Sequence, residues 1–204
     1  MIGIIGNGGH AKVVTDIFLR NNPYETFLYF SKEMGEQTLI DSEQNLQKYL
    51  KTIDKWHVAI GDAHIRHNKL EWLFQHHANV ISAIHDRSVI SDTAKIGAGS
   101  SVMAGSIINP YAYVGKGCII NTGCTIDHDC RISDYVNIGP GCHLAGGVNI
   151  GEFSILGTGA IVIPNVTIGK HCTIGAGAVV IENIPDGCTA VGVPAKIIAQ
   201  KKID

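Results

Sequence analysis

Residues 132–150 read ISDYVNIGPGCHLAGGVNI, and this stretch predicts the fold of the C-terminal half of the chain. An aliphatic residue recurs in it every six residues, from Ile132 to Ile150. The same frame covers residues 90–180, and every position in it is Ile, Val or Leu: Ile90, Ile96, Val102, Ile108, Val114, Ile120, Ile126, Ile132, Ile138, Leu144, Ile150, Leu156, Val162, Ile168, Ile174 and Val180. An α-helix has no six-residue period, so the pattern indicates a repeating β-structure.

A second position of the repeat, four residues after the aliphatic one, is mostly small, as at Ala94, Ser100 and Ala112. A large and a small side chain pointing inward once per hexad favour short strands joined by tight turns, with three hexads per coil of a parallel β-helix. Residues 18 apart should then stack on one another. A β-sandwich would show a period of two and irregular loops, so it fits poorly.

Five of the six cysteines occupy the small inward position, and only Cys188 lies outside it. No CxxC pair occurs in the chain, which argues against a metal site or a redox pair. Because Cys behaves as a small buried hydrophobe, we interpret these residues as core and predict no metal.

The composition divides the chain. Gly is sparse from residue 10 to 96 and dense afterwards, every Cys lies after residue 117, and both Trp precede residue 73. We therefore predict two domains, residues 1–84 and 85–204, the second ending in a short tail.

The formal net charge of −2 gives no electrostatic reason to expect nucleic acid or an anionic membrane as a partner. With no basic leader and no long apolar run, we expect a soluble, cytoplasmic protein.

The first 84 residues alternate between strand-like and helix-like patterns. Strands are predicted at 2–5, 26–30, 57–60 and 79–84. Helices are predicted after His10 to about Asn21, at 43–52 and at 63–77. This βαβαβαβ order predicts a small parallel sheet of Rossmann type.

The first strand runs into Gly6-Asn7-Gly8-Gly9-His10, which opens the first helix. Backbone N–H groups at such a turn can meet a phosphate, but a plain tight turn explains the residues equally well. The full GxGxxG pattern is absent, because Ala11 stands at its last glycine, and no acidic residue ends the second strand.

His128 is the strongest candidate for acid–base chemistry. It lies in Ile126-Asp127-His128-Asp129, at an outward position between two carboxylates. A carboxylate that accepts the Nδ1 proton fixes the tautomer and raises the basicity of Nε2. Gly146 stacks one coil above, where small residues let a thioester approach backbone N–H groups. The alternative is an exposed charged turn, and eight other histidines, His57 and His85 among them, are interpreted as surface side chains.

Several motifs together resemble those of the family of sialic acid O-acetyltransferases and nucleotide-amino-sugar N-acetyltransferases, over nearly the whole chain. They are Gly6–Val14, Ala59–Asp62 with Arg66, Asn121–Gly123, Ile126–Cys130, His143–Gly147 and Val191–Lys196. The resemblance implies a left-handed β-helix, and a homotrimer that binds acetyl-CoA between subunits and a nucleotide-linked amino sugar on the N-terminal domain.

The resemblance also implies roles for individual residues. His128 matches the general base and Asp129 the carboxylate that orients it. The substrate-binding residues would be Gly8, Gly9, His10, Ile60, Gly61, Asp62 and Asn121. The residues that contact acetyl-CoA would be Asn137, Gly146, Thr158 and Ala176. Asn137 departs from the family, which often has His there, and Leu28-Tyr29-Phe30-Ser31 departs where the family often has Asp.

The leading hypothesis is an N-acetyltransferase in which the C4 amine of a nucleotide-linked 4-amino-4,6-dideoxy sugar attacks acetyl-CoA directly. An O-acetyltransferase acting on sialic acid or a related sugar is the alternative within the enzyme class. A catalytically silent β-helix that binds a nucleotide or acts as a scaffold is a third possibility, against which the His128–Asp129 pair argues.

Overall fold

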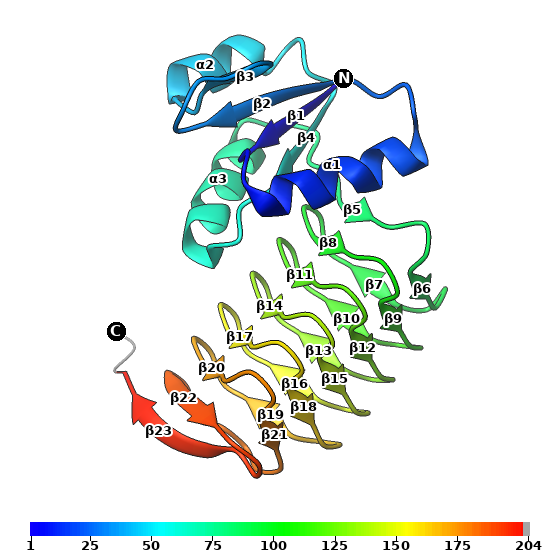
Figure 1. Cartoon of the computed structure of the whole chain (residues 1–204), viewed down its shortest axis with the longest axis vertical. Coiled ribbons are helices and arrows are strands. Elements are labelled where there is room, and N and C mark those ends of the chain that lie inside the picture. Colours follow the sequence, from blue (N-terminus) through cyan, green and yellow to red (C-terminus); the bar gives the residue numbers. More distant parts are fainter. Residues whose placement is uncertain (202–204) are drawn as a thin grey trace.

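The computed structural model describes residues 1–201 of the chain, so the last three residues of the predicted tail lie outside the described residues. An α/β region forms one end of the molecule, and a stack of triangular coils forms the other (Figure 1). The coils form a parallel β-solenoid because strands 18 residues apart pair in register, as Thr125 does with His143 and Ile126 with Leu144. The predicted parallel β-helix is confirmed.

The coils build three walls. Each wall is a parallel sheet, except that the last strand of the first wall runs antiparallel to its neighbour. The first wall contains β5 (Ala83–Ile84), β8 (Ser101–Val102), β11 (Ile119–Ile120), β14 (Asn137–Ile138), β17 (Ile155–Leu156), β20 (Thr173–Ile174), β22 (Cys188–Val191) and the antiparallel β23 (Lys196–Gln200). The second wall contains β6 (Val89–Ile90), β9 (Ile107–Ile108), β12 (Thr125–Ile126), β15 (His143–Leu144), β18 (Ile161–Val162) and β21 (Val179–Val180). The third wall contains β7 (Lys95–Ile96), β10 (Tyr113–Val114), β13 (Arg131–Ile132), β16 (Asn149–Ile150) and β19 (Thr167–Ile168).

The aliphatic ladder forms one continuous core inside the coils. Its members from Val102 to Val180 are buried, and Ile90 and Ile96 pack against them at the N-terminal end of the solenoid. All six cysteines are buried and none is in a disulfide. Burial raises the pKa of the Cys118 thiol to about 12, so this sulfur is a packing group rather than a nucleophile.

The α/β region is a four-stranded parallel sheet with the order β3-β2-β1-β4. Its strands are β1 (Ile2–Ile5), β2 (Phe27–Ser31), β3 (Thr38–Ile40) and β4 (Lys55–Val58), and its helices are α1 (Gly9–Asn21), α2 (Glu43–Tyr49) and α3 (Ala63–Gln75). Figure 1 places α1 and α3 on the side of the sheet that faces the coils and α2 away from them. No helix within residues 1–201 is long and apolar enough to cross a bilayer.

One sequence prediction for this region was wrong, and one strand was missed. The strand predicted at 79–84 does not extend the α/β sheet, because only Val80 bridges Trp56 and β5 then pairs with β8 of the first wall. The short strand β3 was missed, since three residues are too few for a period-two pattern. We therefore draw the proposed boundary between the two regions before β5.

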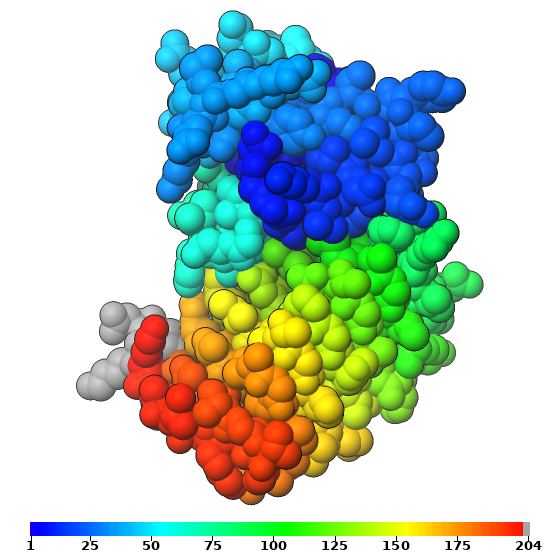
Figure 2. Space-filling view, viewed as in Figure 1, coloured from blue at the N-terminus to red at the C-terminus, as the bar shows by residue number. Residues whose placement is uncertain are grey.

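Two buried basic side chains join the α/β region to the coils, which are in direct contact in Figure 2. His57 was predicted to be a surface histidine, but it is fully buried and bridges the Ile81 carbonyl and the Ser101 hydroxyl. Burial lowers its pKa to about 4, so it is neutral. His85, also predicted at the surface, is 7% exposed. His57 is buried because the coils cover it, which a pattern within one strand does not reveal.

Arg66 is the second of these side chains, and it is 1% exposed. Its Nε donates to the Gly117 carbonyl at 2.7 Å, and its NH1 donates to the carbonyls of Ile60 and Gly61 at 2.7 and 2.9 Å. Its NH2 donates to the Tyr135 carbonyl and the Asn137 Oδ1. The guanidinium thus fastens the β4–α3 loop and α3 to two successive coils.

Candidate active site

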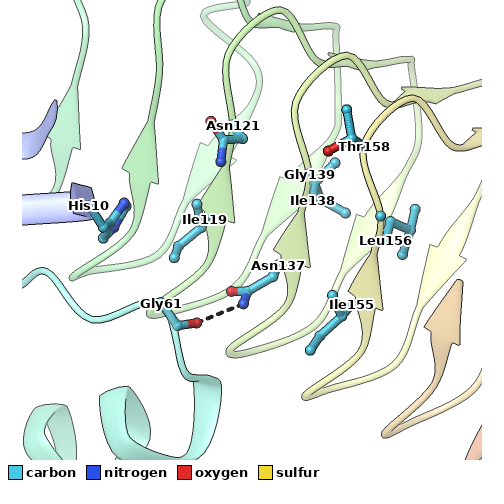
Figure 3. Close-up of a pocket in the computed structure, with 11 residues that line it drawn as sticks. His10, Gly61, Ile119, Asn121, Asn137, Ile138, Gly139, Ile155, Leu156 and Thr158 are labelled. Carbon is cyan, nitrogen blue, oxygen red and sulfur yellow. Dashed lines mark hydrogen bonds between the residues drawn. The ribbon is translucent and has the colours of Figure 1, made fainter. Parts of the chain in front are cut away.

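A cavity of about 320 Å³ opens where the first wall meets the α/β region. Figure 3 shows its lining: His10 and Gly61 come from the α/β region, and Asn121, Asn137 and Thr158 come from the coils. These five residues, all predicted to bind substrate or acetyl-CoA, are therefore brought together although they span 148 positions of the chain. Ile119, Ile155 and Leu156 supply its apolar surface.

His10 lines this cavity, and one of its ring nitrogens has no hydrogen-bond partner among the described residues. Its Nε2 is buried and has no partner within the described residues. Burial, with smaller contributions from His57 and Arg66, lowers the pKa of His10 to about 4, so the ring is neutral. A buried polar atom without a partner is costly, and a bound ligand would satisfy it.

Asn137 lines the cavity and is held in place by two neighbours. Its Nδ2 donates to the Gly61 carbonyl at 2.8 Å, and its Oδ1 accepts from Arg66. Both ends of the amide thus serve the junction between the two regions. The predicted contact of Asn137 with acetyl-CoA stays a prediction, because the described hydrogen bonds assign its polar atoms to Gly61 and Arg66.

His128 lies on a rigid turn between β12 and β13. Its Nδ1 lies 2.8 Å from the Asp129 Oδ2, and its backbone N–H donates to the Asp127 Oδ1 at 2.8 Å. Asn109 donates to the same Asp127 oxygen at 2.7 Å. The hydrogen bond to Asp129, followed by the charge of Asp127, raises the pKa of His128 above its ordinary value of 6.5. With Nδ1–H directed to Asp129, the Nε2 lone pair is available to accept a proton.

Gly146 lies directly over the His128 ring, as the 18-residue spacing predicted. A Cβ added at Gly146 would lie 2.6 Å from both Cε1 and Nε2 of His128. Any side chain at 146 would therefore occupy the space that Nε2 faces. Gly146, His128 and Asp129 line a second cavity of about 260 Å³ together with Pro164 and Asn165.

The two cavities lie on opposite edges of the second wall. Asn121 and Thr158 follow strands of the first wall and precede strands of the second, whereas His128 follows a strand of the second wall and precedes one of the third. One chain therefore does not place His128 beside His10 and Asn121. The outer face of the second wall between them carries exposed apolar side chains, among them Val89, Ile107 and Ile161.

The remaining predicted site residues lie around these cavities. Gly8 is the N-cap residue of α1, and a Cβ at Gly8 or Gly9 would meet nothing within 4 Å, so neither glycine is required by packing. Asp62 caps α3 through its Oδ1, which accepts from the Ile65 N–H at 2.9 Å. Ala176 is exposed one coil beyond Thr158. Ile60 lines a third cavity at the edge of the α/β sheet.

Sequence reasoning missed Asp41, which lines that third cavity with Ile60. The only signal would have been its place after a short apolar run, Thr38–Ile40, which was not recognised as a strand. Within residues 1–201, no group of three or more His, Cys, Asp or Glu side chains is placed to hold a metal ion.

Three family models match the chain: the PglD N-terminal domain over residues 1–73, a GlmU-like C-terminal hexapeptide model over residues 61–145, and the bacterial transferase hexapeptide (six repeats) over residues 147–182. The comparison with curated protein sequences gives no match.

A variant of perosamine N-acetyltransferase from Caulobacter crescentus, in complex with CoA and GDP-perosamine, is 39% identical, with a TM-score of 0.89 over 98% of this chain and 97% of that one. The acetyltransferase domain of PglB from Neisseria gonorrhoeae FA1090, in complex with acetyl coenzyme A, is 34% identical, with a TM-score of 0.91 over 97% of this chain and 98% of that one. WeeI from Acinetobacter baumannii AYE is 27% identical, with a TM-score of 0.86 over 97% of this chain and 99% of that one. With its solenoid and its α/β region both matched, the chain belongs to the hexapeptide-repeat sugar acetyltransferases with a PglD-type N-terminal domain, and it is an acyltransferase.

Proposed function

We propose that the chain transfers the acetyl group of acetyl-CoA to the C4 amine of a nucleotide-linked 4-amino-4,6-dideoxy sugar. The observation that carries this proposal is the His128 ring, whose Nδ1 is held by Asp129 while its Nε2 faces open space over Gly146. The relatives in complex with CoA and GDP-perosamine, and with acetyl coenzyme A, support the two substrates.

The geometry favours direct attack. The amine nitrogen forms a bond to the thioester carbonyl carbon, and His128 Nε2 accepts the proton that the nitrogen loses. Collapse of the tetrahedral intermediate breaks the C–S bond, and the CoA thiolate leaves and takes a proton from the imidazolium. The backbone N–H of Gly146 is the candidate for stabilising the oxyanion, because the N–H groups of Ala145 and Gly147 already donate to the Val162 and His128 carbonyls. A cysteine acyl intermediate is not part of the proposal, since all six thiols are buried.

The proposal includes a shared site in a homotrimer. His10 and Asn121 lie on one edge of the second wall and His128 on the other, so a neighbouring subunit would bring the two sets together. The apolar outer face of the second wall supports an interface there, because exposed apolar patches mark association surfaces.

A complementation experiment tests the shared site. His128→Ala and Asn121→Ala should each be nearly inactive alone, whereas co-expressed mixed oligomers should regain a clear fraction of the activity. A mixture of His128→Ala with His128→Asn is the matched control and should regain none. Recovery no greater than in this control would contradict a site built from two subunits.

The pH profile tests the role of Asp129. As a base, His128 must be neutral, so kcat/KM should rise with pH through the raised pKa of the free enzyme. Asp129→Asn removes the main cause of the raised pKa, so the acidic limb should move to lower pH. Because Asp129 has φ +60°, a conformation that Asn tolerates, the backbone should not change. An unmoved limb would assign the titration to a different group.

The second candidate function is O-acetylation of sialic acid or a related free sugar, which the absence of an acidic residue at the end of β2 leaves open. Titrations with UDP, dTDP, GDP and free sialic acid separate the two. Binding of one nucleotide, with none of sialic acid, supports the nucleotide-linked substrate. Binding of sialic acid alone favours the second candidate.

A further inference from the structure

The third cavity lies at the carboxyl ends of all four strands of the α/β sheet. Its lining includes Gly6 after β1, Phe30 and Ser31 in β2, Asp41 after β3, and Ile60 after β4, and its volume is about 270 Å³. The strand order β3-β2-β1-β4 reverses direction between β1 and β4. In open parallel α/β sheets, ligands bind outside the carboxyl ends of the strands at such a reversal.

The cavity has apolar walls and a floor of backbone. Phe30, Ile60 and Ile65 supply the apolar surface. Gly6 has φ +113°, and a Cβ there would lie 2.6 Å from the Ala59 carbonyl oxygen, so only glycine lets β1 and β4 approach this closely. A flat, mostly apolar ring with polar atoms at its edge is the kind of ligand that suits such a space.

Asp41 provides an acceptor beside these walls, and Lys69, which is not part of the lining, pairs with it. The Asp41 Oδ1 lies 2.7 Å from the Lys69 Nζ, and the carboxylate is 12% exposed. The Asp41 backbone N–H donates to the Ser31 carbonyl at 2.7 Å, and Asn45 donates to the Ile40 carbonyl at 2.8 Å. The carboxylate therefore comes from a segment that is fixed before a ligand binds. The cavity thus has an acidic side chain from the residue after β3, although no acidic residue stands at the end of β2.

We propose that this cavity binds guanine, so that the nucleotide of the substrate is a guanosine diphosphate; this rests on the proposed function. Asp41 accepts from the guanine N1–H and 2-amino groups, and Lys69 holds the Asp41 carboxylate in place through their ion pair. Guanine presents an acceptor followed by two adjacent donors on this edge. In uracil and thymine the single N3–H is flanked by two carbonyl oxygens, so one carboxylate oxygen of Asp41 would face an acceptor, which is unfavourable.

Calorimetric titration with GDP, IDP and UDP tests this assignment, because IDP lacks only the 2-amino group. The wild-type chain should bind GDP more tightly than IDP, and IDP more tightly than UDP. Asp41→Asn should weaken GDP binding by about 10–100-fold, because hydrogen bonds to a charged group are worth about 1.5–3 kcal/mol, and should abolish the difference between GDP and IDP. Lys69→Met should weaken GDP and IDP alike, since both contact the carboxylate that Lys69 holds in place.

Asp16→Asn on the exposed face of α1 is the matched control and should leave all three affinities unchanged. Thermal melting verifies that each variant is folded. UDP binding as tight as GDP to the wild type would overturn the assignment. An equal loss for GDP and UDP in Asp41→Asn would also overturn it, because the carboxylate would then contact the ribose. Binding of no nucleotide at all would instead remove the proposed nucleotide-linked substrate, and the guanine assignment with it.

Discussion

Replacing His128 with alanine should lower kcat by about 10²–10⁴-fold, the range expected when a general base is lost. The ring makes its side-chain hydrogen bond to Asp129 on the surface of the solenoid, and its side chain is 61% exposed. The core ladder does not involve it, so the variant should melt like the wild type. Steady-state kinetics with saturating acetyl-CoA and acceptor measures the loss.

Two control variants distinguish the loss of the base from a structural effect of the substitution. His128→Asn keeps a polar group at the turn but supplies no base, so it should lose as much activity as His128→Ala. His77→Asn changes a histidine on an exposed turn with φ +54°, which Asn tolerates, and should retain full activity. Turnover within a few-fold of the wild type in both His128 variants would remove His128 from the mechanism.

Replacing Arg66 with methionine should lower the free energy of unfolding by about 3 kcal/mol or more. The change leaves four acceptors without this donor: the carbonyls of Ile60, Gly117 and Tyr135, and the Asn137 amide oxygen. The Gly61 carbonyl loses one of two donors and keeps the hydrogen bond from Asn137 Nδ2. Each buried acceptor without a partner costs about 1–3 kcal/mol, and water can reach only some of them. Denaturant unfolding monitored by the fluorescence of the two tryptophans, both in the α/β region, measures the effect.

Arg20→Met is the matched control, because Arg20 makes an exposed pair with Asp86 at 2.8 Å. Exposed pairs are worth about 0–1 kcal/mol, so this variant should unfold almost like the wild type. Arg66→Lys should fall between the two, since an ammonium has three donors without the planar geometry of a guanidinium. Equal stabilities of Arg66→Met and Arg20→Met would show that Arg66 does not fasten the two regions together.

The solenoid could be predicted from sequence because its rule is local and repeats. Each hexad places one aliphatic side chain inward, so the frame that starts at Ile90 also predicts that Gly146 lies over His128. The same frame explains the cysteines as core. A long repeat leaves few alternatives, and this is why residue positions on the coils, as well as the fold, follow from spacing.

The junction between the two regions could not be predicted in the same way. His57 resembles a surface histidine until the coils cover it, and Arg66 carries no pattern that reveals its five acceptors. The strand β3 is too short to show a period, so Asp41 after it was not recognised as part of a cavity. These features depend on contacts between segments far apart in the chain, and the periodicity of a sequence does not reveal such contacts.

The central claim is that the chain acetylates the amine of a nucleotide-linked sugar, and release of free CoA tests it most directly. Acetyl-CoA is mixed with a GDP-linked 4-amino-4,6-dideoxy sugar or with the matching GDP-linked 4-hydroxy sugar, and thiol formation is followed against His128→Ala. The account predicts one thiol per acetylated amine with the amino sugar, little with the hydroxy sugar, and a rate about 10²–10⁴-fold lower in the variant. Equal thiol release with the two sugars, or release unaffected by His128→Ala, would contradict it.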